Sequence, residues 1–265
     1  MSTYVISDIH GCFDIFCRLI AKIGFSDGDI LILGGDYVDR GTQSTEMLRW
    51  LEHKPLNVFP LLGNHDAMFL GYLEDFLSYA ESDYDGLDFE SEREMLKIYG
   101  HFRYFIKVND KFRGTLFDYY GTFEEIIRKG TTLSELKRWH GMLAGMPYIH
   151  KLRVNQKPCI IVHAGYVESY DDIRGKYESI EDFYLNARED AYTIGGLQDG
   201  TVIAGHTPTV NMDYMTYNEG LIFKYYSEEK NCIYFDIDCG SVFRDMIPWA
   251  RLACLRLEDE AEFYE

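Results

Sequence analysis

The chain has 265 residues, with 44 Asp and Glu against 26 Lys and Arg, so its formal net charge is −18 at pH 7. That charge excludes a broad basic surface for nucleic acid or for anionic lipid, and taken alone it also disfavours an anionic substrate. Hydrophobic residues make up 46% of the chain, which is typical of a globular protein. No run approaches 18 apolar residues and no basic leader is visible, so we expect a cytoplasmic protein without a membrane span.

Strands and helices alternate over the first 65 residues. Apolar runs predict strands at residues 4–7, 29–33 and 58–62, and helical spacing of apolar side chains predicts helices at 12–23 and 45–51. Apolar strands separated by helices indicate a buried, mostly parallel sheet. Six cysteines occur without a CxxC pair, so we expect free thiols rather than disulfides or a structural zinc site.

The middle of the chain has a different pattern, mostly helical and rich in Tyr and Phe. Because no Pro/Gly/Ser-rich linker flanks it, we predict a single domain over residues 1–265 with a helical cap inserted at about 67–145. We expect this cap to hold a small core of its own, and its aromatic residues leave open a surface that stacks on a substrate.

Strand patterns return after the helical segment. They lie at residues 148–154, 159–162, 201–204, 221–226, 233–237 and 250–257. The acidic residues 258–265 are expected to be frayed.

Clusters of polar residues and glycine follow five of the predicted strands. They are Asp8-Ile9-His10-Gly11, Gly35-Asp36-Tyr37-Val38-Asp39-Arg40-Gly41, Gly63-Asn64-His65-Asp66, His163-Ala164-Gly165 and Gly205-His206-Thr207-Pro208. Ligands of open α/β sheets bind beyond the carboxyl ends of the strands. We therefore expect six side chains to converge at one rim: Asp8, His10, Asp36, Asn64, His163 and His206.

These residue types are metal ligands. Carboxylate, imidazole and amide ligands suit Mn, Fe or Zn, and glycine lets the backbone approach an ion closely. Six candidates exceed what one tetrahedral ion with an open position needs. They suit two ions that share a carboxylate, the arrangement that clamps a phosphoryl group during in-line displacement.

The same segments resemble the signature motifs of the calcineurin-like metallophosphoesterases, in particular those of the phosphoprotein phosphatase family. Ser7 to Gly11 is similar to GDxHG, Gly35 to Gly41 matches GDxVDRG, and Gly63 to Asp66 is similar to GNHE. The remaining motifs of the family resemble the two later histidine clusters and Ile237-Asp238-Cys239-Gly240. Within the family, the bacterial and bacteriophage branch is the one that the segment Asn186-Ala187-Arg188-Glu189 most resembles. The resemblance covers nearly the whole chain outside the helical segment.

The resemblance implies an α/β fold, a four-layer αββα sandwich of mixed sheets, with a helical insert. It implies two divalent metal ions, Mn first, with Fe or Zn as alternatives. One ion would be held by Asp8, His10 and Asp36, and the other by Asp36, Asn64, His163 and His206. A water activated by the metals would be the nucleophile, without a covalent phosphoenzyme.

The remaining roles are also implied by the resemblance. His65 would be the general acid that protonates the leaving oxygen, and Asp39 would orient it. Arg40 and Arg188 would bind phosphate oxygens together with Asn64, although the loose motif around Arg188 leaves another arginine, such as Arg174, as an alternative clamp.

Three functions remain open from the sequence. The first is hydrolysis of phosphoserine or phosphothreonine in a protein, because the motifs resemble that branch. The second is hydrolysis of a dinucleoside polyphosphate such as diadenosine tetraphosphate, whose adenine could stack on the aromatic insert. The third is a non-catalytic phosphate-binding scaffold, which predicts a missing ligand or acid, and this sequence lacks neither.

Overall fold

The computed structural model describes residues 1–83, 91–108 and 118–265. Residues 84–90 and 109–117 of the predicted helical cap lie outside the described residues. None of the described helices is both long and apolar enough to cross a membrane. The six cysteines are free, as the sequence predicts.

The first sheet has the strand order β10-β9-β1-β2-β3. Its strands are β1 (Thr3–Ile6), β2 (Ile30–Leu33), β3 (Val58–Pro60), β9 (Ala253–Arg256) and β10 (Ala261–Tyr264). β1, β2 and β3 run parallel, whereas β9 is antiparallel to β1 and to β10. The C-terminal residues are therefore not frayed, and that expectation is wrong. They form an edge strand because Phe263 packs against Tyr4, with 6.2 Å between the ring centroids, and because Arg18 and Lys22 bind Glu265.

The second sheet has the strand order β4-β5-β6-β8-β7. Its strands are β4 (Ile149–Val154), β5 (Lys157–Val162), β6 (Thr201–Ala204), β7 (Phe223–Ser227) and β8 (Cys232–Asp236). β5, β6 and β8 are parallel, and β4 and β7 are antiparallel edges. Apolar side chains from both sheets, among them Val5, Ile32, Ile161 and Phe235, form the core between them.

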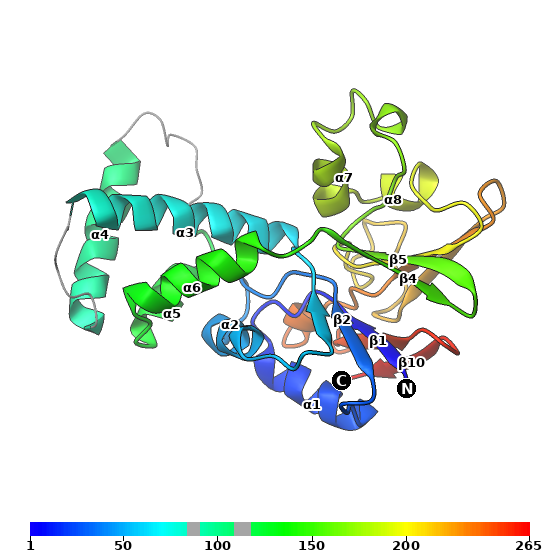
Figure 1. Ribbon diagram of the computed structural model, residues 1–265, viewed down its shortest axis with the longest axis horizontal. Helices are drawn as coiled ribbons and strands as arrows, with labels where there is room; N and C mark the ends of the chain where they lie inside the picture. The colour runs from blue at the N-terminus through cyan, green and yellow to red at the C-terminus, as the bar shows by residue number, and fades with distance from the viewer. Residues whose placement is uncertain (84–90, 109–117) are drawn as a thin grey trace.

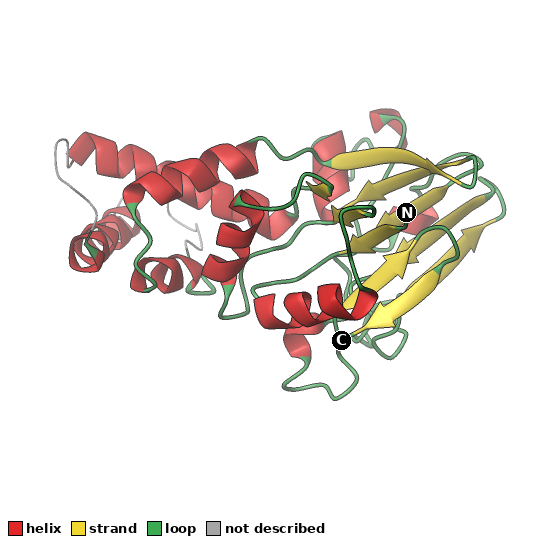
Figure 2. Cartoon of the chain, turned by 60° about the horizontal axis from the view of Figure 1, so that its bottom comes forward, coloured by secondary structure: helices red, strands yellow, loops and turns green. Residues whose placement is uncertain are grey.

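Helices cover the two outer faces of the sandwich. α1 (Phe13–Ile23) and α2 (Ser44–Glu52) pack on the first sheet, and α7 (Ile180–Asn186) and α8 (Asp190–Thr193) on the second. Short 3₁₀ turns lie at Tyr170–Asp172 and Ser241–Phe243. The predicted sandwich of two mixed sheets between helical layers is confirmed (Figures 1 and 2).

Four helices extend away from the sandwich as one body, which we call the helical arm (Figure 1). They are α3 (Asn64–Asp83), α4 (Glu92–Val108), α5 (Thr122–Arg128) and α6 (Leu133–Ala144). Its buried side chains, such as Phe76 and Trp139, belong to the same apolar cluster as Phe16 of α1 and Met47 of α2. The expected separate core is therefore wrong, because the arm packs directly onto the helices of the first sheet.

Candidate metal centre

The polypeptide segments that follow β1 and β2 run side by side. The amide of Asp8 donates to the Gly35 carbonyl at 3.1 Å, and that of His10 donates to the Asp36 carbonyl at 2.8 Å. Six of the predicted site residues have positive φ angles between 46° and 72°: Asp8, His10, Asp36, Asp39, Arg40 and His206. This conformation is costly for residues other than glycine and accumulates at functional sites, so the surrounding hydrogen bonds must hold it.

Two glycines are required by the close approach of the acidic side chains. A Cβ atom at Gly63 would lie 2.3 Å from Oδ1 and from the backbone nitrogen of Asp36, and one at Gly205 would lie 1.9 Å from Oδ2 of Asp8. Any side chain at either position would displace a carboxylate that the sequence predicts to be a ligand.

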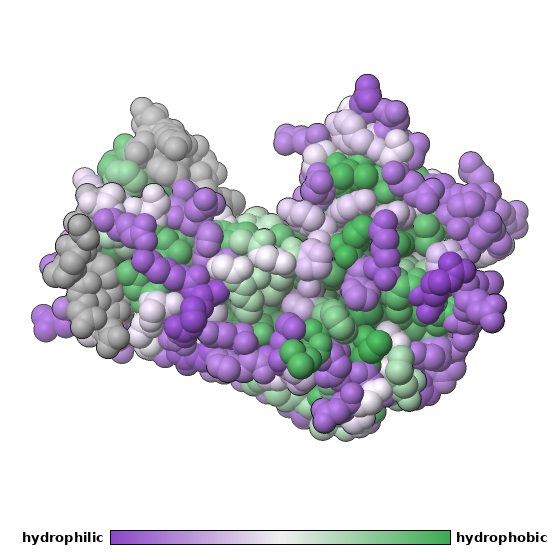
Figure 3. Space-filling model, viewed as in Figure 1, coloured by the Kyte–Doolittle hydropathy of each residue, from purple (hydrophilic) through white to green (hydrophobic). Residues whose placement is uncertain are grey.

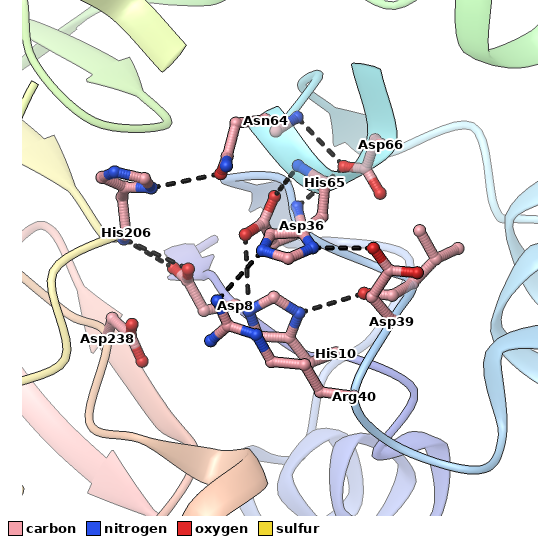
Figure 4. A network of polar contacts seen from close by, with 12 residues as sticks. Asp8, His10, Asp36, Asp39, Arg40, Asn64, His65, Asp66, His206 and Asp238 are labelled. Atoms are coloured by element: carbon pink, nitrogen blue, oxygen red, sulfur yellow. Dashed lines mark hydrogen bonds and ion pairs between the residues drawn. The ribbon is translucent and has the colours of Figure 1, made fainter. Parts of the chain in front are cut away.

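Asp36 lies at the centre of the cluster (Figure 4). Its Oδ2 is 3.3 Å from Nε2 of His10, and its Oδ1 is 3.5 Å from Nε2 of His163. Oδ1 of Asn64 lies 2.9 Å from Nε2 of His163 and 3.1 Å from Nδ1 of His206. Among the described residues, two groups of three candidate ligands share Asp36, each with its ligand atoms within 4.8 Å of one another: His10, Asp36 and His65, and Asp36, His163 and His206.

The histidine rings are held by backbone carbonyls. Nδ1 of His10 lies 3.0 Å from the Val38 oxygen, and Nδ1 of His163 lies 2.9 Å from the Gly34 oxygen. Donation from Nδ1 leaves the Nε2 lone pair directed into the cluster, the usual support of a metal-binding histidine. Burial lowers the pKa of His10 and His163, so both rings are neutral, as metal ligands must be.

The buried carboxylates repel one another. Burial raises the pKa of Asp36 well above its ordinary value, and the neighbouring Asp8 and Asp66 raise it further. Burial and Asp8 likewise raise the pKa of Asp238. Divalent cations would offset this repulsion, and the donor set of imidazole nitrogens, carboxylate oxygens and one amide oxygen suits Mn, Fe or Zn. The residues present therefore fit two divalent ions.

Asp8 and His65 are both buried in the cluster, but they have different hydrogen-bond partners. Asp8 is buried, and its two oxygens accept hydrogen bonds from the backbone amide of His206 at 3.1 and 3.0 Å. His65 stands within one of the two candidate ligand groups, but both of its ring nitrogens have partners. Nδ1 lies 2.7 Å from Oδ2 of Asp39, and Nε2 lies 3.0 Å from Nη2 of Arg40. The contact with Asp39 holds the imidazole ring at Nδ1.

Of the two alternative arginines, only Arg188 contacts the candidate site. Its Nη1 donates to the backbone oxygen of His206 at 3.2 Å, and its guanidinium lies 5.0 Å from the centroid of the Tyr214 ring. Arg174 instead pairs with Asp171 at an exposed position. The structure thus brings together every residue that the sequence predicts for the site.

Three further residues contribute contacts that the sequence analysis did not assign. Asp66 accepts hydrogen bonds from the amides of Asp36, Tyr37 and Gly63 at 2.7, 2.9 and 3.0 Å, which ties two strand ends together. Asp238 lies beside Asp8 (Figure 4), in the motif Ile237-Asp238-Cys239-Gly240, which by itself predicts no role for this carboxylate. The Thr122 hydroxyl donates to Oδ1 of Asp39 at 2.5 Å, and no sequence signal marks that threonine.

Known proteins share sequence and fold with this chain. A bis(5′-nucleosyl)-tetraphosphatase (symmetrical) from Chromobacterium violaceum is 47% identical over 77 residues, which are 29% of this chain and 28% of that protein. This chain thus aligns with about a quarter of the length of that curated relative.

Solved structures share the fold at low identity. A metallophosphoesterase from Sphaerobacter thermophilus has a TM-score of 0.52 at 14% identity and covers 100% of this chain and 86% of its own. A protein serine/threonine phosphatase from Saccharomyces cerevisiae has a TM-score of 0.50 at 13% identity and covers 100% of this chain and 79% of its own. Residues 1–210 match the family model described as calcineurin-like phosphoesterase, and this chain belongs to that family.

Proposed function

We propose that this chain is a two-metal phosphoesterase whose preferred substrate is a dinucleoside polyphosphate. The observation that carries the reaction is the pair of candidate ligand groups that share Asp36, with the buried His65–Asp39 pair beside them. A scaffold that only binds phosphate has no need of the His65–Asp39 pair. The phosphoprotein reading of the motifs becomes the second candidate.

The proposed ligands divide between two positions. One ion is assigned to Asp8, His10 and Asp36, and the other to Asp36, Asn64, His163 and His206. Two divalent ions bound there would polarise the phosphoryl group and lower the cost of deprotonating the attacking water. Mn is our first choice, with Fe or Zn as alternatives that the same donors accept.

The other side chains act on the substrate. His65 gives a proton from Nε2 to the leaving oxygen, while Asp39 holds Nδ1 and so fixes the direction of the ring. Arg40 and Arg188 bind the phosphate oxygens, together with Asn64. Because Arg40 contacts Nε2 of His65 in this structure, its guanidinium must turn toward the phosphate when substrate binds.

Aromatic surfaces on two sides of the cluster support the choice of substrate. On the His65 side, Tyr120 is 43% exposed, and its ring centroid lies 5.3 Å from that of His65. On the His206 side, Tyr177 and Tyr214 line a cavity of about 420 Å³ together with Arg188. The surface is hollowed between the helical arm and the side that carries α7 and α8 (Figure 3). A dinucleoside polyphosphate has two nucleosides, one for each of these aromatic surfaces, whereas a phosphorylated side chain would need only one of the surfaces. The names of the relatives support the same choice.

A direct comparison of substrates tests this proposal. With Mn²⁺, we expect kcat/KM for diadenosine tetraphosphate to exceed that for a phosphoserine peptide by roughly tenfold or more. Ion-exchange chromatography of the products gives the position of cleavage. A ratio in the opposite direction would favour the phosphoprotein reading. Failure to hydrolyse these substrates or p-nitrophenyl phosphate with Mn²⁺, Fe²⁺, Zn²⁺ or Mg²⁺ would leave only the scaffold.

A further inference from the structure

A chain of hydrogen bonds connects the helical arm to the proposed general acid. The Thr122 hydroxyl donates to Oδ1 of Asp39 at 2.5 Å, and Oδ2 of the same carboxylate lies 2.7 Å from Nδ1 of His65. All three side chains are buried, with Thr122 3%, Asp39 5% and His65 4% exposed. One group on each oxygen therefore fixes the carboxylate that orients the imidazole.

Thr122 is held in place from both sides. It is the first residue of α5, and the Asp118 carboxylate just before the helix accepts the amides of Phe123 at 2.7 Å and Glu124 at 3.2 Å. Further along α5, Glu125 accepts the hydroxyl of Thr45, in α2, at 3.0 Å. The Thr122 hydroxyl therefore lies at a helix end that is capped by Asp118 and bound through Glu125 to α2 of the sandwich.

The hydroxyl has a specific physical consequence for the acid. A buried carboxylate oxygen without a donor is costly, and a carboxylate held at one oxygen alone can rotate about its Cβ–Cγ bond. Rotation of Asp39 would turn the imidazole with it and misdirect Nε2. Proton transfer depends on that direction, because the donor must lie within hydrogen-bond reach of the leaving oxygen.

We propose that Thr122 is a positioning residue for leaving-group protonation, acting through Asp39 on His65, so that the helical arm is part of the catalytic machinery. This inference rests on the proposed function, because it requires His65 to act as the acid. Thr122 does not itself contact the substrate in this scheme.

Three variants test the proposal. Thr122→Val keeps the shape and removes the hydroxyl, and Thr122→Ser restores it. Thr131→Val is the matched control, because Thr131 is equally buried beyond the other end of α5 and donates to the Ile126 carbonyl at 2.7 Å, away from Asp39. Phenyl phosphate and p-nitrophenyl phosphate, whose leaving groups differ in basicity, are the substrates.

We expect Thr122→Val to lower kcat for phenyl phosphate by roughly tenfold or more, with a much smaller loss for p-nitrophenyl phosphate and little change in KM. Thr122→Ser should recover most of the loss, and Thr131→Val should match the wild type in the ratio of the two rates. A second readout needs no metal: the low-field proton resonance of His65 Nδ1–H should shift in Thr122→Val and stay in place in Thr131→Val.

Other outcomes overturn the inference. Equal losses on both esters, the same loss in Thr131→Val, or an unchanged resonance in Thr122→Val would each reduce Thr122 to a structural role. Failure of the proposed phosphoesterase activity is distinguishable, because the wild type itself would then hydrolyse neither ester with Mn²⁺, Fe²⁺, Zn²⁺ or Mg²⁺. Failure of the proposed substrate preference would leave the test intact, because it uses neither proposed substrate.

Discussion

The rim of the sandwich and the start of α5 both serve the candidate site, but by different means. At the rim, four of the six proposed ligands come from backbone in strained conformations, held by hydrogen bonds between neighbouring strand ends: Asp8, His10, Asp36 and His206. At α5, Thr122 and Tyr120 reach the site from a separate helical arm, through side-chain contacts with Asp39 and Arg40. The proposed ligands are thus placed by the chain around each strand end, whereas the surroundings of His65 depend on how the helical arm packs on the sandwich.

The largest expected effect lies at the rim. Asp36→Asn removes the carboxylate that both ligand groups share, so we expect activity with Mn²⁺ to fall by about a thousandfold or more. Metal analysis after gel filtration should show lost or weakened binding. Asp171→Asn, at an exposed position in the 3₁₀ turn Tyr170–Asp172, is the control and should leave both measurements unchanged. Full activity in Asp36→Asn would refute the bridging role.

Loss of the acid should come next in size. We expect His65→Asn to slow hydrolysis by roughly a hundredfold or more for phenyl phosphate and much less for p-nitrophenyl phosphate, because a good leaving group needs little protonation. Metal stoichiometry should stay at the wild-type value, since His65 is bound to Asp39 and Arg40 rather than assigned as a ligand. An equal loss on both esters, or loss of one metal, would contradict this assignment.

Smaller effects are expected at the aromatic surfaces. Tyr120→Ala and Tyr214→Ala should each raise KM for diadenosine tetraphosphate by roughly fivefold or more, because stacking of a base on an aromatic ring is worth about 1–3 kcal/mol. Neither should change KM for p-nitrophenyl phosphate by as much. Tyr104→Ala is the control, since that ring is 69% exposed on α4. If both substrates respond alike, the rings do not hold nucleosides.

The smallest effect is expected on stability, at the Asp118 carboxylate that caps the start of α5. Asp118→Ala removes the acceptor for two amides at the start of α5, so the free energy of unfolding should fall by about 1 kcal/mol in a urea titration. Asp171→Ala is the surface control, because that side chain is exposed, and it should leave the free energy of unfolding nearly unchanged. A loss of rate on phenyl phosphate that exceeds the loss in Thr122→Val would show that α5 acts on the acid through more than the hydroxyl.

The net charge of the chain and the charges at the candidate site lead to opposite expectations for the charge of the substrate. The net charge of −18 disfavours an anion, yet the proposed ligand set would gather cations. Arg188 contacts the backbone oxygen of His206, and Arg40 contacts His65 beside the ligands. The negative charge therefore describes the surface as a whole. Phosphate binding should depend on bound metal, because the unligated cluster is rich in carboxylates.

The sequence by itself determined where most strands lie and which polar residues follow them, and its family resemblance implied the sandwich. Most strands are local apolar runs, and each predicted ligand follows such a run within a few residues, so this pattern was enough to predict that Asp8, Asp36 and His163 converge. The structure brings them together from two sheets. The tertiary structure decided what no local pattern encodes. Strand β10 exists because β9 offers it a partner, and the helical arm shares a core with α1 and α2 because their apolar faces meet. Thr122 reaches Asp39 across 83 positions of sequence, and only packing of the arm on the sandwich brings such distant side chains into hydrogen-bond distance.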